Sequence, residues 1–152
     1  MAQGMKPEQL SEAIIEGLRT YTSDVQNKVA KAVKDATKTA YEEITELSPV
    51  RKKVPKSGVI MVRRNGRKVP AADNLQPGAY KKGWISTVRN YTDSNRTQGY
   101  VRNKTNYPLV HLLELGHENK MDGSMVKAIP HVKPGQDKGR EQLDKDIKKI
   151  LE

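Results

Sequence analysis

Residues 10–47, LSEAIIEGLRTYTSDVQNKVAKAVKDATKTAYEEITEL, place an apolar or small side chain at about every fourth position. The mean step between these positions is about 3.7 residues, close to the period of an α-helix. One stripe can therefore follow one face of a helix for about 60 Å, at 1.5 Å per residue. A small core cannot cover a helix of this length, so part of the stripe is predicted to be a contact surface. The stripe consists of Leu10, Ile14, Leu18, Tyr21, Val25, Val29, Val33, Ala36, Ala40, Ile44 and Leu47.

Residues that suit helix termini mark both ends of this segment. Pro7 fits the first turn of a helix, and Pro49 disfavours helical backbone at Ser48, where the helix should end. Gly17 lowers helix stability, and the polar patch at 20–24 could cap a second helix. The sequence therefore predicts a long N-terminal helix and allows a break near Ser23.

The composition provides little material for a large core. Of the 152 residues, 35% are hydrophobic, Phe is absent and Trp84 is the single tryptophan. The length suits one domain, and the absence of Cys excludes a disulfide scaffold, a thiolate metal site and a cysteine nucleophile. No apolar run approaches the roughly 20 residues of a membrane span, and residues 1–6 lack a secretory signal. We therefore expect a soluble protein with no membrane partner.

The excess of positive charge lies in the middle of the chain. The whole sequence carries 28 Lys and Arg against 18 Asp and Glu. Residues 51–110 hold 14 Lys and Arg but only two acids, Asp73 and Asp93, which gives a net charge of +12. Such a segment repels itself and stays extended until something anionic neutralises it. The alternatives are a solvated basic loop and a contact with nucleic acid or an acidic protein surface.

Residues 50–78 are predicted to form a flexible basic arm or loop, because they combine this charge with several Gly and Pro. A short hairpin within the arm is predicted to turn at Asn65 and Gly66, a pair that readily adopts positive φ. The candidate residues for contact with DNA or an acidic partner are Arg51, Lys52, Lys53, Arg63, Arg64, Arg67 and Lys68.

The rest of the chain mixes strand and helix patterns. The predicted elements are strands over 80–90 and 98–104 joined by a turn at 93–95, a short buried helix over 107–115 that ends before Gly116, a strand over 125–129, and a last helix after Pro134. This order predicts the α+β class: a long N-terminal helix, a small antiparallel β-sheet with a long basic loop or hairpin arm, a short central helix and a C-terminal helix. We expect one domain over 1–152.

Aromatic side chains lie among the cations of the basic segment, a mixture that can neutralise phosphates and stack bases. They are Tyr80, Trp84, Tyr91, Tyr100 and Tyr107. Strand alternation, however, would place many of them inward as part of the small core and leave charge alone outside. Charge alone supports only non-specific contact with nucleic acid.

The candidate chemical groups are three histidines and one carboxylate in an apolar setting. His111 and His117 are six residues apart, whereas metal-binding helices space their histidines by three or four. A loop could still bring His117 and His131 together with Glu114 or Asp122 as a metal site. Glu114 could be a catalytic group, but we interpret it as an acceptor that fixes a backbone or a neighbouring subunit.

Three short stretches and one dipeptide carry a resemblance to a known family. They are Gly78–Trp84 (GAYKKGW), Tyr107–His117 (YPLVHLLELGH), Ala128–Pro134 (AIPHVKP) and, at the end of the long helix, Ser48–Pro49. In order and spacing over about residues 25–152, they resemble the head-tail joining or tail-completion (neck) proteins of long-tailed bacteriophages. These proteins are often labelled minor capsid or minor tail proteins. The family's gap after Ser-Pro is short, whereas here residues 50–77 intervene.

The resemblance implies a structural virion protein that joins the phage tail to the head, as one subunit of a ring around the DNA channel. Its implied partners are copies of itself, most simply in a hexamer, together with connector and tail-tube proteins; it would be made in the cytoplasm of the bacterial host. The predicted subunit contacts are Leu10, Ile14, Leu18, Val25, Val29 and Glu114. We expect no catalytic activity, cofactor or metal.

Two alternatives to this hypothesis stay open. One is a basic nucleic-acid-binding module that acts outside the virion and whose binding falls steeply with salt. The other is a metal-dependent nuclease, which requires His111, His117 and His131 to converge.

Overall fold

The computed structural model describes residues 7–50, 57–119 and 122–152, with the side chains at positions 7–10, 74 and 93 left out. The elements in order are α1 (Pro7–Leu47), β1 (Met61–Arg64), β2 (Arg67–Pro70), the 3-10 turn η1 (Asp73–Leu75), α2 (Ala79–Lys82), β3 (Trp84–Tyr91), the 3-10 turn η2 (Thr92–Ser94), β4 (Arg96–Asn103), α3 (Tyr107–Leu115), β5 (His117–Glu118), β6 (Met125–Val126) and α4 (Val132–Leu151). This order confirms the α+β class and the predicted sequence of long helix, antiparallel strands, short helix and C-terminal helix.

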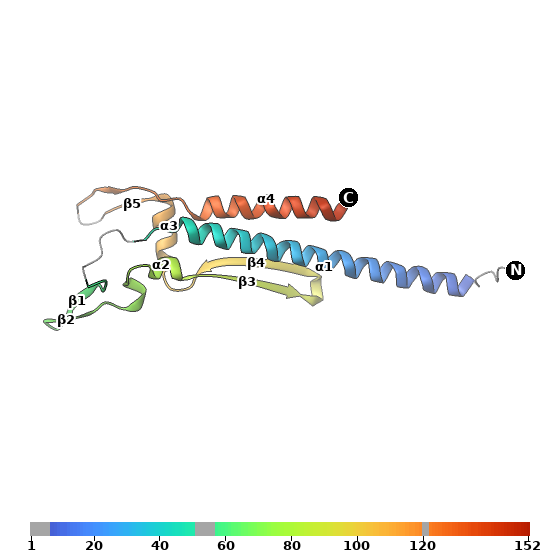
Figure 1. Cartoon of the computed structure of the whole chain (residues 1–152), viewed down its shortest axis with the longest axis horizontal. Coiled ribbons are helices and arrows are strands. Elements are labelled where there is room, and N and C mark those ends of the chain that lie inside the picture. The colour runs from blue at the N-terminus through green and yellow to red at the C-terminus, as the bar shows by residue number, and fades with distance from the viewer. Residues whose placement is uncertain (1–6, 51–56, 120–121) are drawn as a thin grey trace.

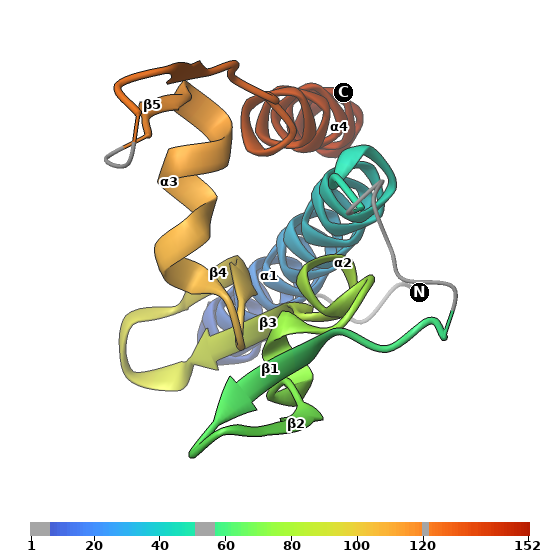
Figure 2. The same ribbon diagram turned by 90° about the vertical axis from the view of Figure 1, so that its left-hand side faces the viewer.

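The molecule is elongated, and α1 is its longest element. Figure 1 shows α4 along one side of α1 and the β3–β4 hairpin along the other, with α4 antiparallel to α1. Figure 2 shows the shorter elements gathered around one end of this assembly. None of the described helices is long and apolar enough to cross a membrane.

Helix α1 is continuous, so a break near Ser23 is wrong. The Thr22 hydroxyl donates to the Leu18 carbonyl at 2.8 Å, which satisfies this polar side chain without leaving the helix. The end of the helix is as predicted. The Ser48 hydroxyl donates to the Ile44 carbonyl at 2.6 Å, and Pro49 follows.

Helices α1 and α4 pack closely because small residues meet at their interface. Gly135 and Gly139 of α4 are buried. A Cβ atom at Gly139 would lie 2.9 Å from the Ala40 Cβ and 3.0 Å from the Ala36 carbonyl oxygen. Only glycine therefore permits this spacing between the two helices, and the core lies along their shared surface.

The β3–β4 hairpin packs its inner face on α1. Its register runs from Trp84 opposite Asn103 to Tyr91 opposite Arg96. Gly99 faces α1, where a Cβ would overlap the Thr37 side chain. The turn comes at η2 as predicted, with Asn95 in the left-handed region. Tyr80, which was predicted in the first strand, lies instead in the short helix α2.

The other strands form two further two-stranded pairs rather than extending this hairpin. The predicted turn at Asn65 and Gly66 joins β1 to β2, with φ values of 52° and 76°. The strand predicted over 125–129 is shorter, because only Met125 and Val126 pair, with β5.

Two expectations for the helices in this part of the chain were wrong. The central helix α3 has the predicted bounds, but none of its residues is buried, because the helix lies at the edge of the molecule (Figure 2). Helix α4 begins at Val132, before Pro134, since Pro134 is tolerated in the first turn of a helix.

Candidate functional site

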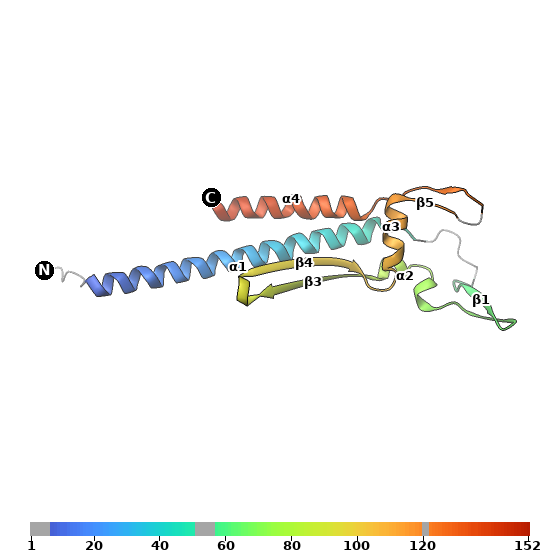
Figure 3. The same ribbon diagram turned by 180° about the vertical axis from the view of Figure 1, so that it is seen from behind.

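The N-terminal part of α1 has an apolar stripe that none of the described residues covers. Residues 11–24 are all exposed, and this part of the helix projects beyond the hairpin and the end of α4 (Figures 1 and 3). We call Ile14, Ile15, Leu18 and Tyr21 the bare stripe; their exposed fractions run from 50% to 69%. Ala32 and Ile44, further along the helix, are 4% and 3% exposed.

The bare stripe continues the stripe that packs inside the molecule. Val25 and Val29, between the two parts, are half-buried and line a groove of about 330 Å3 between α1 and the tip of the β3–β4 hairpin. Of the predicted subunit contacts, Ile14 and Leu18 are therefore bare, while Val25 and Val29 mark where the cover begins. The side chain of Leu10 lies outside the described part of the chain.

The hairpin of β1 and β2 concentrates positive charge. Arg63, Arg64, Arg67 and Lys68 are all exposed, and the register places Arg64 opposite Arg67 and Arg63 opposite Lys68. Like charges directly opposite each other destabilise a strand pair. None of the ion pairs among the described residues involves these four cations. The other predicted contacts, Arg51, Lys52 and Lys53, lie outside the described residues.

A second basic surface lies on the outer face of the β3–β4 hairpin. We call it the arginine–tyrosine face, and it consists of Arg89, Tyr91, Arg96, Tyr100 and Arg102. The Arg96 guanidinium carbon lies 4.9 Å from the centre of the Tyr91 ring. The sequence pattern did not reveal this face, because strand alternation was expected to place many of the aromatic side chains inward. Trp84 is indeed buried, but alternation from Trp84 places Arg89 and Tyr91 outward.

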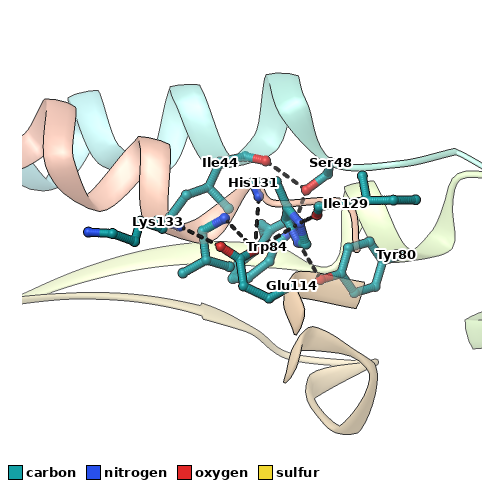
Figure 4. Close-up of polar contacts among 9 residues, drawn as sticks. Ile44, Ser48, Tyr80, Trp84, Glu114, Ile129, His131 and Lys133 are labelled. Atoms are coloured by element: carbon teal, nitrogen blue, oxygen red, sulfur yellow. Dashed lines mark hydrogen bonds and ion pairs between the residues drawn. The ribbon is translucent and has the colours of Figure 1, made fainter. Parts of the chain in front are cut away.

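The sequence stretches that carry the family resemblance meet in one buried joint (Figure 4). The Trp84 indole N–H donates to the Ser48 hydroxyl at 2.7 Å, and the Tyr80 and His131 rings each pack edge-on against Trp84. Glu114 reaches the start of α4. The joint thus ties the end of α1, the start of β3, α3 and the start of α4 together.

Glu114 caps the N-terminus of α4. The backbone N–H groups of His131 and Val132 donate to Glu114 Oε2 at 2.8 and 2.9 Å, and that of Lys133 donates to Oε1 at 2.9 Å. Burial raises the pKa of the Glu114 carboxyl, but these N–H groups and the His131 ring outweigh burial, so its pKa lies below the ordinary value. Glu114 therefore fixes a backbone within its own chain; its contact with a neighbouring subunit stays a prediction.

His131 is completely buried, and both of its ring nitrogens lie within hydrogen-bond distance of a partner. Nδ1 lies 2.7 Å from the Ile129 carbonyl oxygen, which can only accept, so Nδ1 carries a proton. Nε2 lies 2.7 Å from the Tyr80 hydroxyl oxygen. Burial, together with the charge of Glu114, raises the pKa of Tyr80 to about 12. Tyr80 is therefore neutral, and this network is suited to holding elements together.

The three histidines occupy different surroundings. His111 is exposed on α3, His117 is half-buried in β5, and His131 lies in the joint. Across the described residues, no three His, Asp or Glu side chains gather as a metal site would need.

Comparison of the chain with family models, with curated proteins and with solved structures found no match.

Proposed function

We propose that the chain is a structural subunit of the head-tail junction of a long-tailed bacteriophage, and that it forms a ring, most simply a hexamer, around the DNA channel. The proposal places the protein in the virion at the tail end of the junction, next to connector and tail-tube proteins, after synthesis in the host cytoplasm. It assigns no reaction, cofactor or metal to the chain. The observation that carries the proposal is the bare stripe.

The bare stripe favours assembly on energetic grounds. Fully burying a Leu or Ile side chain contributes about 1.5–3 kcal/mol, and Ile14, Ile15 and Leu18 are each at least half exposed. Ile14 and Leu18 belong to the same stripe that, further along, is covered by the subunit's own hairpin and α4, and Ile15 lies next to it. A neighbouring copy presents the same kinds of covering surface.

The subunit also has a surface that suits the stripe of a neighbour. A groove of about 570 Å3 lies between α1, β4 and α4, lined in part by Val33, Ala40, Val101 and Leu143. Contact between a stripe and a different surface of the next copy is heterologous, and such contacts close into rings when the rotation between copies allows it. We propose this groove as the place where the stripe docks.

The β1–β2 hairpin supports a role next to an anionic partner. Its four exposed cations lie opposite one another across the two strands and repel each other. An anion that lies against them would relieve this repulsion. Channel DNA or an acidic neck protein would provide it. The predicted mobility of residues 50–78 in the free subunit is tested by hydrogen exchange, where strong protection throughout the segment would count against it.

Native mass spectrometry of the purified protein, alone and mixed with its neck-protein neighbours, tests the assembly. We expect closed oligomers from the unaltered chain and monomers from Leu18→Glu. The matched control is Thr20→Glu, which adds the same charge at an exposed position about 160° around the helix from Leu18, at 100° per residue, and outside the hollow that Ile15 and Leu18 line. An unaltered protein that stays monomeric at every concentration and with every neck protein would sink the proposal.

The second candidate, a nucleic-acid-binding module outside the virion, is favoured by the arginine–tyrosine face. It predicts tight binding with a steep dependence on salt, since each neutralised phosphate releases counterions. Tight binding by a protein that stays monomeric would decide for this candidate, whereas ring formation would decide for the structural role.

A further inference from the structure

The arginine–tyrosine face combines three cations with two aromatic rings on the outer surface of one hairpin. Within residues 84–103 the cations are Arg89, Arg96 and Arg102, and Asp93 in the turn is the only acid. All three arginines are exposed, and no ion pair among the described residues involves them. Their charge is therefore available to an anionic ligand.

The face is also hollowed at its centre. Thr87, Arg89, Tyr100 and Arg102 line a depression of about 310 Å3, within the range of small-ligand sites. Tyr100 is 43% exposed. Two guanidinium groups and one aromatic ring thus surround a space open to solvent. Guanidinium groups bind phosphate oxygens in pairs, and an exposed ring offers a surface on which a base can stack.

The hydroxyl groups of the two tyrosines hydrogen bond to each other, which lowers the pKa of Tyr91 and raises that of Tyr100. The pKa of Tyr91 lies below its ordinary value because Tyr100 and Arg89 hydrogen bond to its hydroxyl and because the charges of Arg89 and Arg96 favour its anion. The hydroxyl of Tyr91 thus lies among groups that stabilise negative charge.

The β1–β2 hairpin lies on the same side of the molecule. In Figures 1 and 2 both hairpins lie on the side of α1 that faces away from α4. A strand of nucleic acid on the arginine–tyrosine face can therefore continue toward the cations at Arg63–Lys68 without crossing α4.

We propose that the outer face of the β3–β4 hairpin binds single-stranded nucleic acid, with Arg89, Arg96 and Arg102 on its phosphates and Tyr100 stacked on a base. An acidic protein would use the same cations, but an exposed ring beside a hollow also matches the flat face of a base, and competition by polyglutamate distinguishes the two partners. The site goes beyond the proposed ring contact, because neither the bare stripe nor the groove between α1, β4 and α4 includes these arginines.

The first test measures the affinity of the full-length protein for a labelled oligothymidylate over a salt series. Arg89→Gln/Arg102→Gln should weaken binding about tenfold or more. It should also make the slope of log affinity against log salt shallower by about 1.4, at roughly 0.7 per phosphate of a single strand. The matched control is Lys145→Gln/Lys149→Gln, which removes two exposed charges from α4 and should change affinity less than about twofold.

The second test separates stacking from charge. Tyr100→Ala should weaken oligothymidylate binding about tenfold and leave binding to a duplex of the same length unchanged, whereas Tyr100→Phe should retain both. Circular dichroism checks that each variant is folded. Native mass spectrometry checks that each variant still assembles, so that loss of this site is distinguished from loss of the ring.

Three results would overturn the proposal. One is no binding of oligothymidylate at physiological salt. Another is equal affinity of the Arg89→Gln/Arg102→Gln variant and its lysine control, or of Tyr100→Ala and Tyr100→Phe. The third is competition by polyglutamate as strong as that by unlabelled oligothymidylate, which would assign the face to an acidic protein partner.

Discussion

The two parts of α1 share one helical period but have opposite surroundings. Toward its C-terminal end, small residues such as Ala36 and Ala40 let α4 approach at Gly139, and Gly99 lets the hairpin approach at Thr37. Toward its N-terminal end, the larger side chains of Ile14, Leu18 and Tyr21 lie in solvent. An amphipathic pattern thus predicts which face of a helix can be buried, whereas the elements that pack against the helix determine how much of that face is covered.

The largest effect is expected where the covered part of α1 meets the joint. Trp84→Ala removes a side chain that is 4% exposed and that packs against His131 and Tyr80. We expect the free energy of unfolding to fall by about 3–5 kcal/mol, measured by urea unfolding with circular dichroism. Tyr107→Ala, at a ring that is 72% exposed, is the control. Equal losses for both would mean that the joint does not hold the fold.

Replacing a glycine by alanine should change the free energy of unfolding in opposite directions at the covered and the uncovered part of α1. Gly139→Ala, on α4, forces its Cβ against Ala40 and the Ala36 backbone, so we expect a loss of about 1–3 kcal/mol. Gly17→Ala, in the uncovered part, meets no atom within 4 Å and should stabilise by up to about 1 kcal/mol. Thermal unfolding of the two variants measures both. A loss at Gly17 in a monomeric sample would contradict the separation of the two parts.

An intermediate effect that depends on pH is expected at Glu114. Because its pKa is lower in the folded chain than in the unfolded one, its contribution is complete above the ordinary carboxyl pKa of about 4.3 and is lost as pH falls through the folded value. Glu114→Gln should cost about 1 kcal/mol at neutral pH, as loss of a helix cap does. The variant should also lose less stability on acidification than the unaltered chain. Parallel acid profiles would show that the carboxylate does not cap α4.

The smallest effect on stability is expected in the bare stripe. Leu18→Ala should change the free energy of unfolding of the monomer by less than about 0.5 kcal/mol, because truncating an exposed side chain leaves no cavity inside the subunit. Urea unfolding at low protein concentration measures this. A loss of several kcal/mol would mean that the uncovered part packs within its own subunit.

The sequence predicted best those features that depend on residues close together in the chain. The period of 10–47 predicted α1, and the pair Asn65 and Gly66 predicted a turn, because both signals act over a few residues. The end at Ser48 followed from Pro49. The break near Ser23 was wrong because a polar patch alone does not show that Thr22 can bond within the helix.

Features that depend on distant residues escaped prediction. Glu114 caps a helix that begins 18 residues later, at Val132, and no local pattern links the two. Tyr80 was placed in a strand because its partner, His131, lies 51 residues away. The arginine–tyrosine face required knowing that Trp84 points inward. Once the orientation of Trp84 is known, alternation along β3 predicts which of its other side chains point outward.

The attachment of α1 at one end only has a mechanical consequence. The helical segment from Pro7 to Asp24 is about 27 Å long at 1.5 Å per residue, and its residues 11–24 are exposed. Among the described residues, the hairpin and α4 contact α1 beyond this segment, toward its C-terminal end. This segment pivots near Val25. A tilt of about 10° there displaces the N-terminal end of α1 by about 5 Å, so a small rotation near Val25 becomes a large translation of any partner bound to that end.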